Sequence, residues 1–325
     1  MEAQEFRGIL NTLDQLNTYQ FKRLKKMIHK IESSDLVVFN LETNPEVLQC
    51  PHCGSKKIWQ WGKRTGLQRY RCKECKKTFN SLTGTPLAHL HKKEHWLLYS
   101  QSLRNGDSVR KVASFIKINK NTAFHWRHRF LQNAKKVKPI SLNGIVEAEE
   151  KFRPKSYKGS KSLNRPPRKR GIKPGKIHLA KEQICISVFR DRNGNTIDQV
   201  SKHLSEATLQ HALKRTMKPD SLFCSDNKDS YRKFIMNNHI RHGCLNLSAG
   251  IHTIKEIVHI HNADSYHNQF SNWMLRFHGV ATKYLPNYLA WFREMDEFEQ
   301  KIKASTFLLR AKEPTPYKVQ PQFRT

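Results

Sequence analysis

Four cysteines in the N-terminal third of the chain have the spacing of a metal centre. They form two Cys-x-x-Cys pairs with 18 residues between the pairs: Cys50, Cys53, Cys72 and Cys75. Each pair can form a tight knuckle, and the intervening residues can form the hairpin that brings the knuckles together. Four thiolates at this spacing are typical ligands of a tetrahedral Zn²⁺ ion. We therefore expect a structural zinc ribbon over residues 46–80.

Three acidic residues at the ends of expected core elements could serve a different chemistry. They are Glu149 in "GIVEAEEKF", Asp226 in "SLFCSD" and Asp264 in "HNADSYHNQF". An isolated buried carboxylate is costly, and a divalent cation removes that cost. Two Mg²⁺ ions about 3.5–4 Å apart can activate a water or a 3′ hydroxyl and stabilise the leaving oxygen of a phosphodiester. Taken singly, each carboxylate also fits a helix cap or an exposed surface position.

Glu147 is a further candidate on the first of these strands. Side chains alternate between the two faces of a strand, so Glu147 and Glu149 share one face. Either or both could face a metal ion.

The composition indicates a polyanionic partner. The chain has 59 Lys and Arg against 27 Asp and Glu, a formal net charge of +32, and such an excess favours binding to nucleic acid. An anionic membrane is the other polyanion to consider, but no apolar run approaches the ~18 residues of a spanning helix, and the N-terminus does not resemble a signal peptide. We expect a cytoplasmic, nucleoid-associated protein that binds double-stranded DNA.

The remaining cysteines are expected to be reduced and to fill the core: Cys185, Cys224 and Cys244.

Residues 107–130 predict two short helices joined by a turn. Asp107 or Ser108 can cap the first helix, and Asn119 can cap the second. The apolar face of the second helix consists of Ala123, Trp126 and Phe130. The side chains expected to project from its other side are Asn121, Thr122, His125, His128 and Arg129. A helix-turn-helix would place such side chains in a major groove, whereas an ordinary helical hairpin would leave them in water.

Beyond residue 139 the pattern changes to alternating strands and helices, which predicts a mixed α/β domain over residues 139–306. The segment 151–176 lies between the first two expected strands and contains 11 Lys or Arg, no acidic residue and several Pro and Gly. A solvated linker can look like this, but the lack of balancing acids favours a phosphate-binding arm. Its candidate contact residues are Arg168, Lys169 and Arg170.

The remaining segments complete the expected domain order. Residues 1–45 have apolar side chains at helical spacing and predict a helical lead-in, and residues 81–138 are assigned to the helix-turn-helix domain. The tail 307–325 is expected to be irregular.

Several of these segments, in this order, resemble the ISXO-like insertion-sequence transposases of the DDE superfamily. The similarity is carried by the zinc ribbon and by the segments "SVRKVASFIKINKNTAFHWRHRF", "GIVEAEEKF", "FCSDNKDSY" and "HNADSYHNQFSNWMLRFHGVATKYLPNYLAWFR". The last of these, above all "GVATKYLPNYLAWFR", is the most specific. The match covers most of the chain.

The resemblance implies a ribonuclease H-like catalytic domain that coordinates two Mg²⁺ ions for DNA strand cleavage and transfer. Carried over by position, its three acids fall on Glu149, Asp226 and Asp264. The family usually has aspartate at the first of these positions, so Glu149 is one methylene longer. A basic residue often found two helical turns after the third acid is Ser271 here.

Two functions of different kinds follow from this reading. The first is a transposase that binds terminal inverted repeats, cleaves and joins DNA, and works as a homo-oligomer on paired element ends. The second is a domesticated, sequence-specific DNA-binding protein on an inactive copy of the same scaffold. A related nuclease or recombinase acting on another DNA structure is a third reading.

Overall fold

A computed structural model describes residues 3–42, 49–136, 141–163, 182–218, 220–246, 249–254, 257–297 and 302–313. The chain divides into two compact units. The first comprises residues 1–106, 112–122 and 303–325, and the second comprises residues 107–111 and 123–302. The division thus falls within the predicted helical hairpin and not at the ends of the expected domain 81–138.

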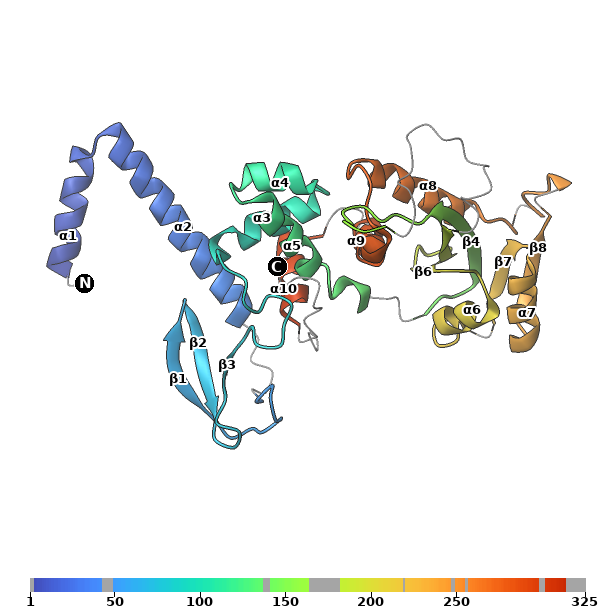
Figure 1. Ribbon diagram of the computed structural model, residues 1–325, viewed down its shortest axis with the longest axis horizontal. Coiled ribbons are helices and arrows are strands. Elements are labelled where there is room, and N and C mark those ends of the chain that lie inside the picture. Colours follow the sequence, from blue (N-terminus) through green and yellow to red (C-terminus); the bar gives the residue numbers. More distant parts are fainter. Residues whose placement is uncertain are drawn as a thin grey trace. The chain divides into compact units, whose positions relative to one another are not determined.

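The first unit begins with helices and a small antiparallel sheet (Figure 1). The helices are α1 (Ala3–Thr12) and α2 (Thr18–Glu42), which agree with the predicted helical lead-in. The strands, in sheet order, are β1 (Ile58–Arg64), β2 (Leu67–Cys72) and β3 (Thr78–Asn80). Thr65 and Gly66 join β1 to β2 with φ values of 50° and 79°. Positive φ at both positions is what a two-residue hairpin turn of type I′ requires.

The C-terminal part of this unit corrects the expectation of an irregular tail from residue 307. Ala304–Lys312 form helix α10, in which Phe307 and Leu308 are buried. This helix packs against α2 and against α3 (Trp96–Arg104). Segments from both ends of the chain therefore build the first unit.

The second unit contains a five-stranded sheet in the order β6-β5-β4-β7-β8. Its strands are β4 (Ile145–Pro154), β5 (Gln183–Asp191), β6 (Thr196–Ser201), β7 (Leu222–Asp226) and β8 (Arg241–Leu245). β5 runs antiparallel to β4 and β6, whereas β7 is parallel to β4 and β8 is parallel to β7. This arrangement confirms the predicted mixed α/β class. β4 includes residues 151–154, so the segment predicted as a loop from residue 151 begins later.

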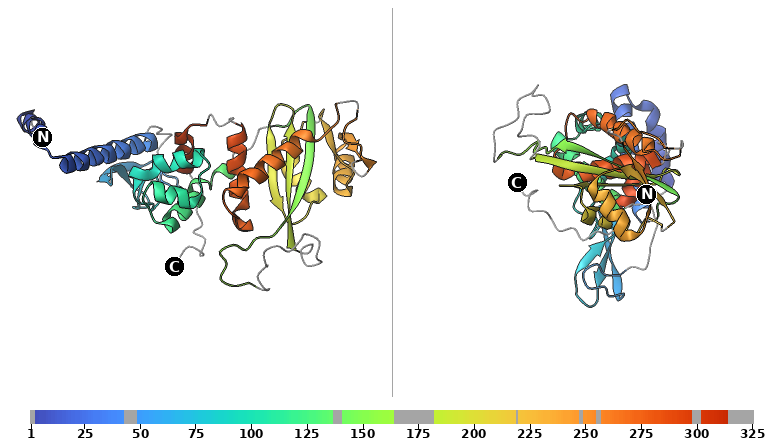
Figure 2. Two further views of the ribbon diagram at one scale, coloured as in Figure 1. Left: turned by 90° about the horizontal axis from the view of Figure 1, so that it is seen from above. Right: turned by 90° about the vertical axis from the view of Figure 1, so that its right-hand side faces the viewer.

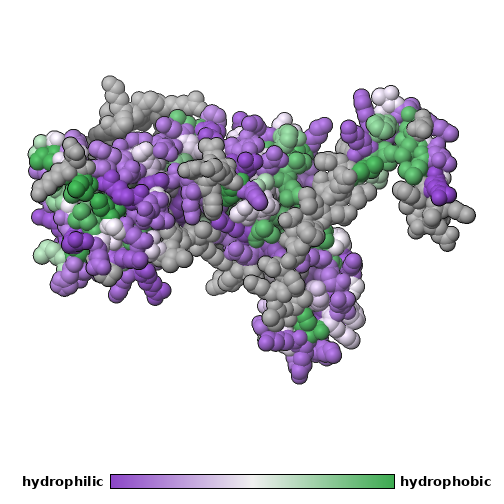
Figure 3. All heavy atoms as spheres, turned by 180° about the vertical axis from the view of Figure 1, so that it is seen from behind, coloured by the Kyte–Doolittle hydropathy of each residue, from purple (hydrophilic) through white to green (hydrophobic). Residues whose placement is uncertain are grey.

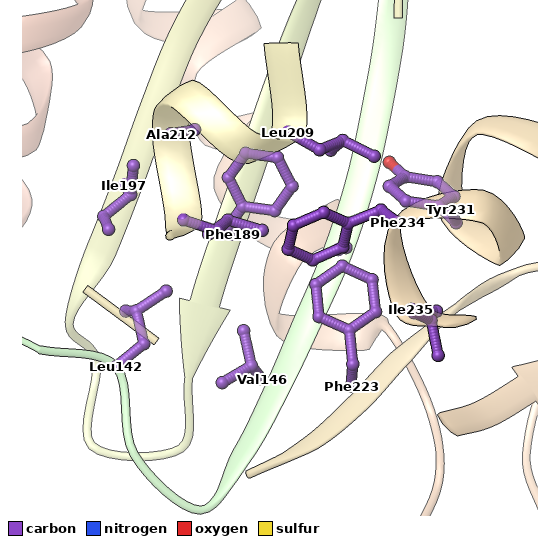
Figure 4. Packing of buried hydrophobic residues seen from close by; sticks show 12 residues of the cluster. Leu142, Val146, Phe189, Ile197, Leu209, Ala212, Phe223, Tyr231, Phe234 and Ile235 are labelled. Atoms are coloured by element: carbon purple, nitrogen blue, oxygen red, sulfur yellow. The ribbon is translucent and has the colours of Figure 1, made fainter. Parts of the chain in front are cut away.

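Two helices cover one face of this sheet and enclose its main core (Figure 4). They are α6 (Glu206–Leu213), which begins with a capping box at Ser205, and α7 (Asp229–Asn238). Val146 and Ala148 of β4 point into this core, together with Phe223 of β7. Alternation along β4 therefore sends Glu147 and Glu149 to the opposite face.

The opposite face packs against α8 (His261–Leu275) and α9 (Leu285–Glu297) (Figure 2). A buried ion pair joins Asp198 of β6 to Arg293 of α9, and the Tyr266 hydroxyl of α8 donates to Asp198 Oδ2 at 2.8 Å. The "YLPNYLAWFR" segment thus contributes its final arginine to the interior. Ala263 and Phe270 of α8 are buried as well.

The predicted helical hairpin is formed by α4 (Val109–Phe115) and α5 (Lys120–Phe130). In α5 the expected apolar residues are buried: Ala123, Trp126 and Phe130. His128 is also buried, which corrects the expectation that it projects from the helix. Its ring stacks on Tyr284 with centroids 3.8 Å apart. The C-terminal half of α5 therefore belongs to the interior of the second unit.

Candidate active site and metal centre

The four predicted zinc ligands come together. Their sulfur atoms all lie within 4.8 Å of one another, with Cys50 Sγ 3.6 Å from Cys75 Sγ and Cys53 Sγ 3.6 Å from Cys72 Sγ. A tetrahedral ion with Zn–S bonds of about 2.3 Å needs sulfur–sulfur distances of roughly 3.8 Å. Burial raises the pKa of the Cys72 thiol, but the backbone N–H groups of Cys75 and Glu74 lower it, to about 7 overall. The geometry and the stabilised thiolate fit a metal ion.

The backbone around the two pairs explains why they form matching knuckles. The residue after each pair, Gly54 or Lys76, has positive φ, 74° and 59°. This turn lets the Cys50 N–H donate to the Ser55 carbonyl at 2.9 Å and the Cys72 N–H donate to the Lys77 carbonyl at 3.0 Å. Both knuckles therefore close in the same way, one before β1 and one after β2, at the open end of the hairpin.

Glu147 has a structural role in the second unit. Its carboxylate is 0% exposed and accepts hydrogen bonds from the backbone N–H groups of Asn262 and Ala263, at 2.7 and 3.1 Å. These are free N–H groups of the first turn of α8, where a negative charge is favourable. Arg192 adds an ion pair at 3.1 Å. Of the two glutamates on this face, Glu147 has its oxygens fully engaged in fixing α8 to β4.

Glu149 lies two residues further along β4 and is held differently. Its Oε2 is buried and has no hydrogen-bond partner in the described part of the chain. Burial, followed by repulsion from Asp264, raises the pKa of Glu149 to about 7. The positive charge of Lys151 opposes this shift but does not cancel it, so the carboxylate changes protonation state near neutral pH.

Asp226 ends β7 beside Glu149. The parallel register pairs Glu147 with Cys224, so Glu149 and Asp226, each two residues further on, occupy the next equivalent position on the same face. Asp226 Oδ1 is buried without a hydrogen-bond partner among the described residues, while Oδ2 pairs with Lys228 Nζ at 2.5 Å. Adjacent strands thus carry two carboxylate oxygens that lack hydrogen-bond donors.

Asp264 approaches the same region from the first turn of α8. Lys151 Nζ donates to its Oδ1 at 2.6 Å and to Asn268 Oδ1 at 2.9 Å. The hydrogen bond from Lys151 lowers the pKa of Asp264, although burial opposes this. His267, one turn later, is buried and lies with Nε2 3.3 Å from the backbone carbonyl of Glu149. That contact ties the helix to the strand at the level of the carboxylates.

The three predicted acids form pairs and not a single tight cluster. Glu149 interacts with Asp264 and neighbours Asp226 across the sheet. Among the described residues, however, the cysteines are the one group of three or more His, Cys, Asp or Glu side chains close enough to hold one ion. Carboxylate oxygens that are buried and short of donors are the kind of ligand that Mg²⁺ prefers. The three carboxylates are therefore ligands of the type that binds Mg²⁺, and Glu149 is the one that neighbours both of the others.

Two lysines at this site were missed by the sequence analysis. Lys151 follows Glu149 by two residues and Lys228 follows Asp226 by two, so each contacts one of the candidate acids. Lys228 also pairs with Glu150, which accepts a hydrogen bond from the Tyr231 hydroxyl at 2.6 Å. Burial lowers the pKa of Lys228, but its contacts with Asp226 and Glu150 raise it overall. The acid-x-Lys spacing, which occurs after both Glu149 and Asp226, is the sequence pattern that could have revealed these lysines.

Ser271 has a cationic neighbour from another element. Its hydroxyl accepts a hydrogen bond from the guanidinium of Arg153, which lies on β4 four residues after Glu149. Arg153 of β4 therefore places a positive charge beside Ser271, where α8 itself has no Lys or Arg.

The predicted DNA contacts divide into three groups. Asn121 and His125 are exposed on α5, and Thr122 and Arg129 are partly exposed. His128 is buried, as described above. The proposed arm residues lie outside the described part of the chain: Arg168, Lys169 and Arg170.

The other expectations concern membranes and the remaining cysteines. Within the described residues, we find no helix with the length and hydrophobicity that a membrane span requires. Cys185 and Cys224 are buried, as predicted, and Cys244 is partly buried.

Comparison with known proteins relates this chain to transposases. Residues 141–294 match the family model described as the ISXO2-like transposase domain, a range that contains all three candidate acids. A protein of Halobacterium salinarum, described as an uncharacterized protein in transposable element ISH50, is 25% identical over 262 residues. That alignment covers 78% of this chain and 86% of the relative. Residues 141–294 are therefore identified as an ISXO2-like transposase domain.

Proposed function

We propose that this protein is the transposase of an insertion sequence, and that it cleaves and joins DNA strands with Mg²⁺ bound by Glu149, Asp226 and Asp264. The observation that carries the proposal is the pair of buried carboxylate oxygens without hydrogen-bond donors, Glu149 Oε2 and Asp226 Oδ1, on adjacent strands. Burial of such groups costs free energy, and a bound cation that completes their coordination removes that cost. The match of residues 141–294 to a transposase domain indicates the class of reaction.

The sheet supports a ribonuclease H-like domain as the scaffold. Three antiparallel strands, β4 to β6, are extended on the other side of β4 by the parallel strands β7 and β8. This order places the first strand at the centre, where its acid can meet one acid from the neighbouring strand and another from a helix on the same face. Glu149, Asp226 and Asp264 have these three origins.

The pairwise arrangement of the acids suits two ions better than one. Bound Mg²⁺ would activate a water or a 3′ hydroxyl and stabilise the leaving oxygen. A two-ion site needs Glu149 to pair separately with Asp226 and with Asp264. Glu149 must be deprotonated to act as a ligand, and its raised pKa of about 7 makes that step pH-dependent. Lys151 orients Asp264 and Lys228 orients Asp226 through direct contacts.

DNA binding is assigned to three basic parts of the chain. The exposed first half of α5, with Asn121, Thr122 and His125, is the part of a recognition helix that enters a major groove. The ribbon, with Zn²⁺ as its ion, and the segment 151–176 add sequence-independent contacts to phosphates. The excess charge of +32 makes double-stranded DNA the expected partner, and paired element ends suggest a homo-oligomer on it.

A DNA-binding protein without cleavage activity is the second candidate. Two observations favour it: Glu149 stands where the family has aspartate, and the three acids do not approach one another as closely as the four cysteines do. The longer side chain shifts any bound ion relative to the phosphodiester, and catalysis tolerates little displacement.

Metal-dependent cleavage separates the two candidates. Purified protein is incubated with Mg²⁺ and DNA carrying the ends of its element, beside the variants Asp226→Asn and Asp229→Asn. Asp229 is an exposed acid on α7 and serves as the matched control. The transposase proposal predicts nicking by the wild type and by Asp229→Asn but not by Asp226→Asn. Tight DNA binding without any product in all three proteins would support the binding-only function.

A further inference from the structure

The outer face of the ribbon sheet carries an exposed aromatic pair that the zinc centre does not explain. Trp59 and Trp61 of β1 are 46% and 42% exposed, with ring centroids 5.5 Å apart. The other tryptophans of the chain are at most 7% exposed: Trp96, Trp126, Trp273 and Trp291. All other tryptophans of the chain are core residues, so two exposed rings side by side indicate a binding surface.

Alternation along the strands separates the two faces of the ribbon. Ile58 and Tyr70 pack with Phe79 around the cysteines. Trp59 pairs across the ladder with Arg71, so both point to the opposite side. The ladder is irregular between Gln60 and Lys63, but the Trp61 ring lies beside Trp59 and Arg71 on the same face. The outer face therefore presents flat rings from an edge strand.

Arginines lie directly beside these rings. The Arg71 guanidinium lies 4.8 Å from the centre of the Trp61 ring. Arg69 is on the same face of β2 and donates to the Thr78 hydroxyl at 3.3 Å. Residues 56–77 contain nine Lys or Arg and one acid, Glu74, which is paired with Lys57. The surface around the hairpin is mainly hydrophilic (Figure 3). This combination of side chains suits a polyanion that also offers flat π faces.

We propose that this outer face binds single-stranded DNA, with unpaired bases stacked on Trp59 and Trp61 and phosphates held by Arg69, Arg71 and their basic neighbours. In a duplex the faces of the bases are covered by their neighbours, so only unpaired bases can stack on protein rings. A sheet with exposed aromatic and arginine side chains suits this mode, because stacking accepts any base. The site is separate from the carboxylates of the second unit, and its occupancy does not depend on cleavage.

Tryptophan fluorescence of the full-length protein tests the proposal directly. Because the other four tryptophans are buried, a ligand on this face quenches the exposed, red-shifted part of the emission. The probes are a 12-nucleotide oligodeoxythymidine and a 12-base-pair blunt duplex, each titrated at equal ionic strength. We expect the single strand to quench this emission and the duplex to leave it largely unchanged. Saturating single strand without quenching, or equal quenching by both probes, would overturn the proposal.

Matched variants give a second readout. The double variant W59L/W61L should bind the oligodeoxythymidine at least about 25-fold more weakly, since stacking on each of the two rings is worth at least about 5-fold. W59F/W61F keeps the rings and should lose only a few-fold. Tyr19→Leu removes an exposed aromatic from α2 and should have no effect. Zinc content is measured for each variant to show that the ribbon is intact. Wild-type affinity in a zinc-loaded W59L/W61L protein would refute the site.

Discussion

Glu147 and Glu149 point to the same face of β4, yet Glu147 caps the first turn of α8 while Glu149 keeps one carboxylate oxygen buried without a donor. Two residues of the same type, on the same strand, thus have opposite energetic roles. The first stabilises the fold, and the second is a cost to the fold that a bound cation would offset. This contrast leads to the first prediction.

Glu149→Gln should make the metal-free protein more stable at pH 8, by on the order of 1–2 kcal/mol. The folded-state pKa of about 7 lies above the ordinary value of 4.5, so the wild type loses stability as pH rises from 4.5 through 7. Glutamine removes that pH dependence. Urea unfolding of both proteins in EDTA, followed by circular dichroism at pH 5 and pH 8, measures the difference.

Glu147→Gln is the matched comparison and should have the opposite effect. Loss of the charge leaves Arg192 and the N-terminus of α8 without their anion, at a cost of roughly 2–3 kcal/mol. Equal destabilisation by both variants at pH 8 would show that Glu149 is as well satisfied as Glu147.

His128 should make the second unit sensitive to acid. Burial and the nearby Arg127 lower the pKa of His128 to about 3, below the ordinary value of 6.5. The neutral ring therefore contributes stability above pH 6.5 that is lost as pH falls, about 2 kcal/mol at pH 5. His128→Phe preserves stacking on Tyr284 and should flatten the unfolding free energy between pH 7 and pH 5. An unchanged pH profile in this variant would assign the acid sensitivity to other groups, of which His267 is the first to test.

The buried ion pair between Asp198 and Arg293 should be essential for the second unit. Asp198→Asn leaves a buried guanidinium without its counter-charge and should cost about 3–5 kcal/mol, measured as a shift of the urea midpoint. The matched surface pair is Arg232 with Asp229, and Arg232→Gln should leave that midpoint unchanged because water already solvates both groups. If the two variants shift the midpoint equally, the interior pair is not a determinant of stability.

Replacement of Cys50 and Cys72 by serine should abolish zinc binding and unfold the ribbon. Zn²⁺ contributes ~10–16 kcal/mol to small domains of this kind, and the ribbon's own apolar cluster is small. The five-stranded sheet has a separate core and should remain folded. Metal analysis by mass spectrometry checks the stoichiometry, and Cys244→Ser, outside the cluster, should retain one zinc per chain. Full zinc content in the double variant would refute the four-cysteine site.

Much of the architecture could be predicted from local patterns. The Cys-x-x-Cys spacing, the period-two strands of the α/β domain and the capped helix at Ser205 depend on neighbours along the chain. The helix α10 escaped prediction because its short apolar pattern gains its stability from packing against α3. Short helices are marginal without tertiary contacts, so sequence periodicity alone did not reveal it.

The sequence by itself determined the ligand type of the metal centre, the fold class and the excess of positive charge, because each depends on residue identity and spacing. Tertiary structure decided which glutamate of β4 is a cap and which lacks a donor, because that depends on where the N-terminus of α8 and Arg192 lie. It also decided that His128 is interior, since Tyr284 covers it from 156 residues away in the chain. Strand alternation assigns a side chain to a face, but only packing determines which group meets it there.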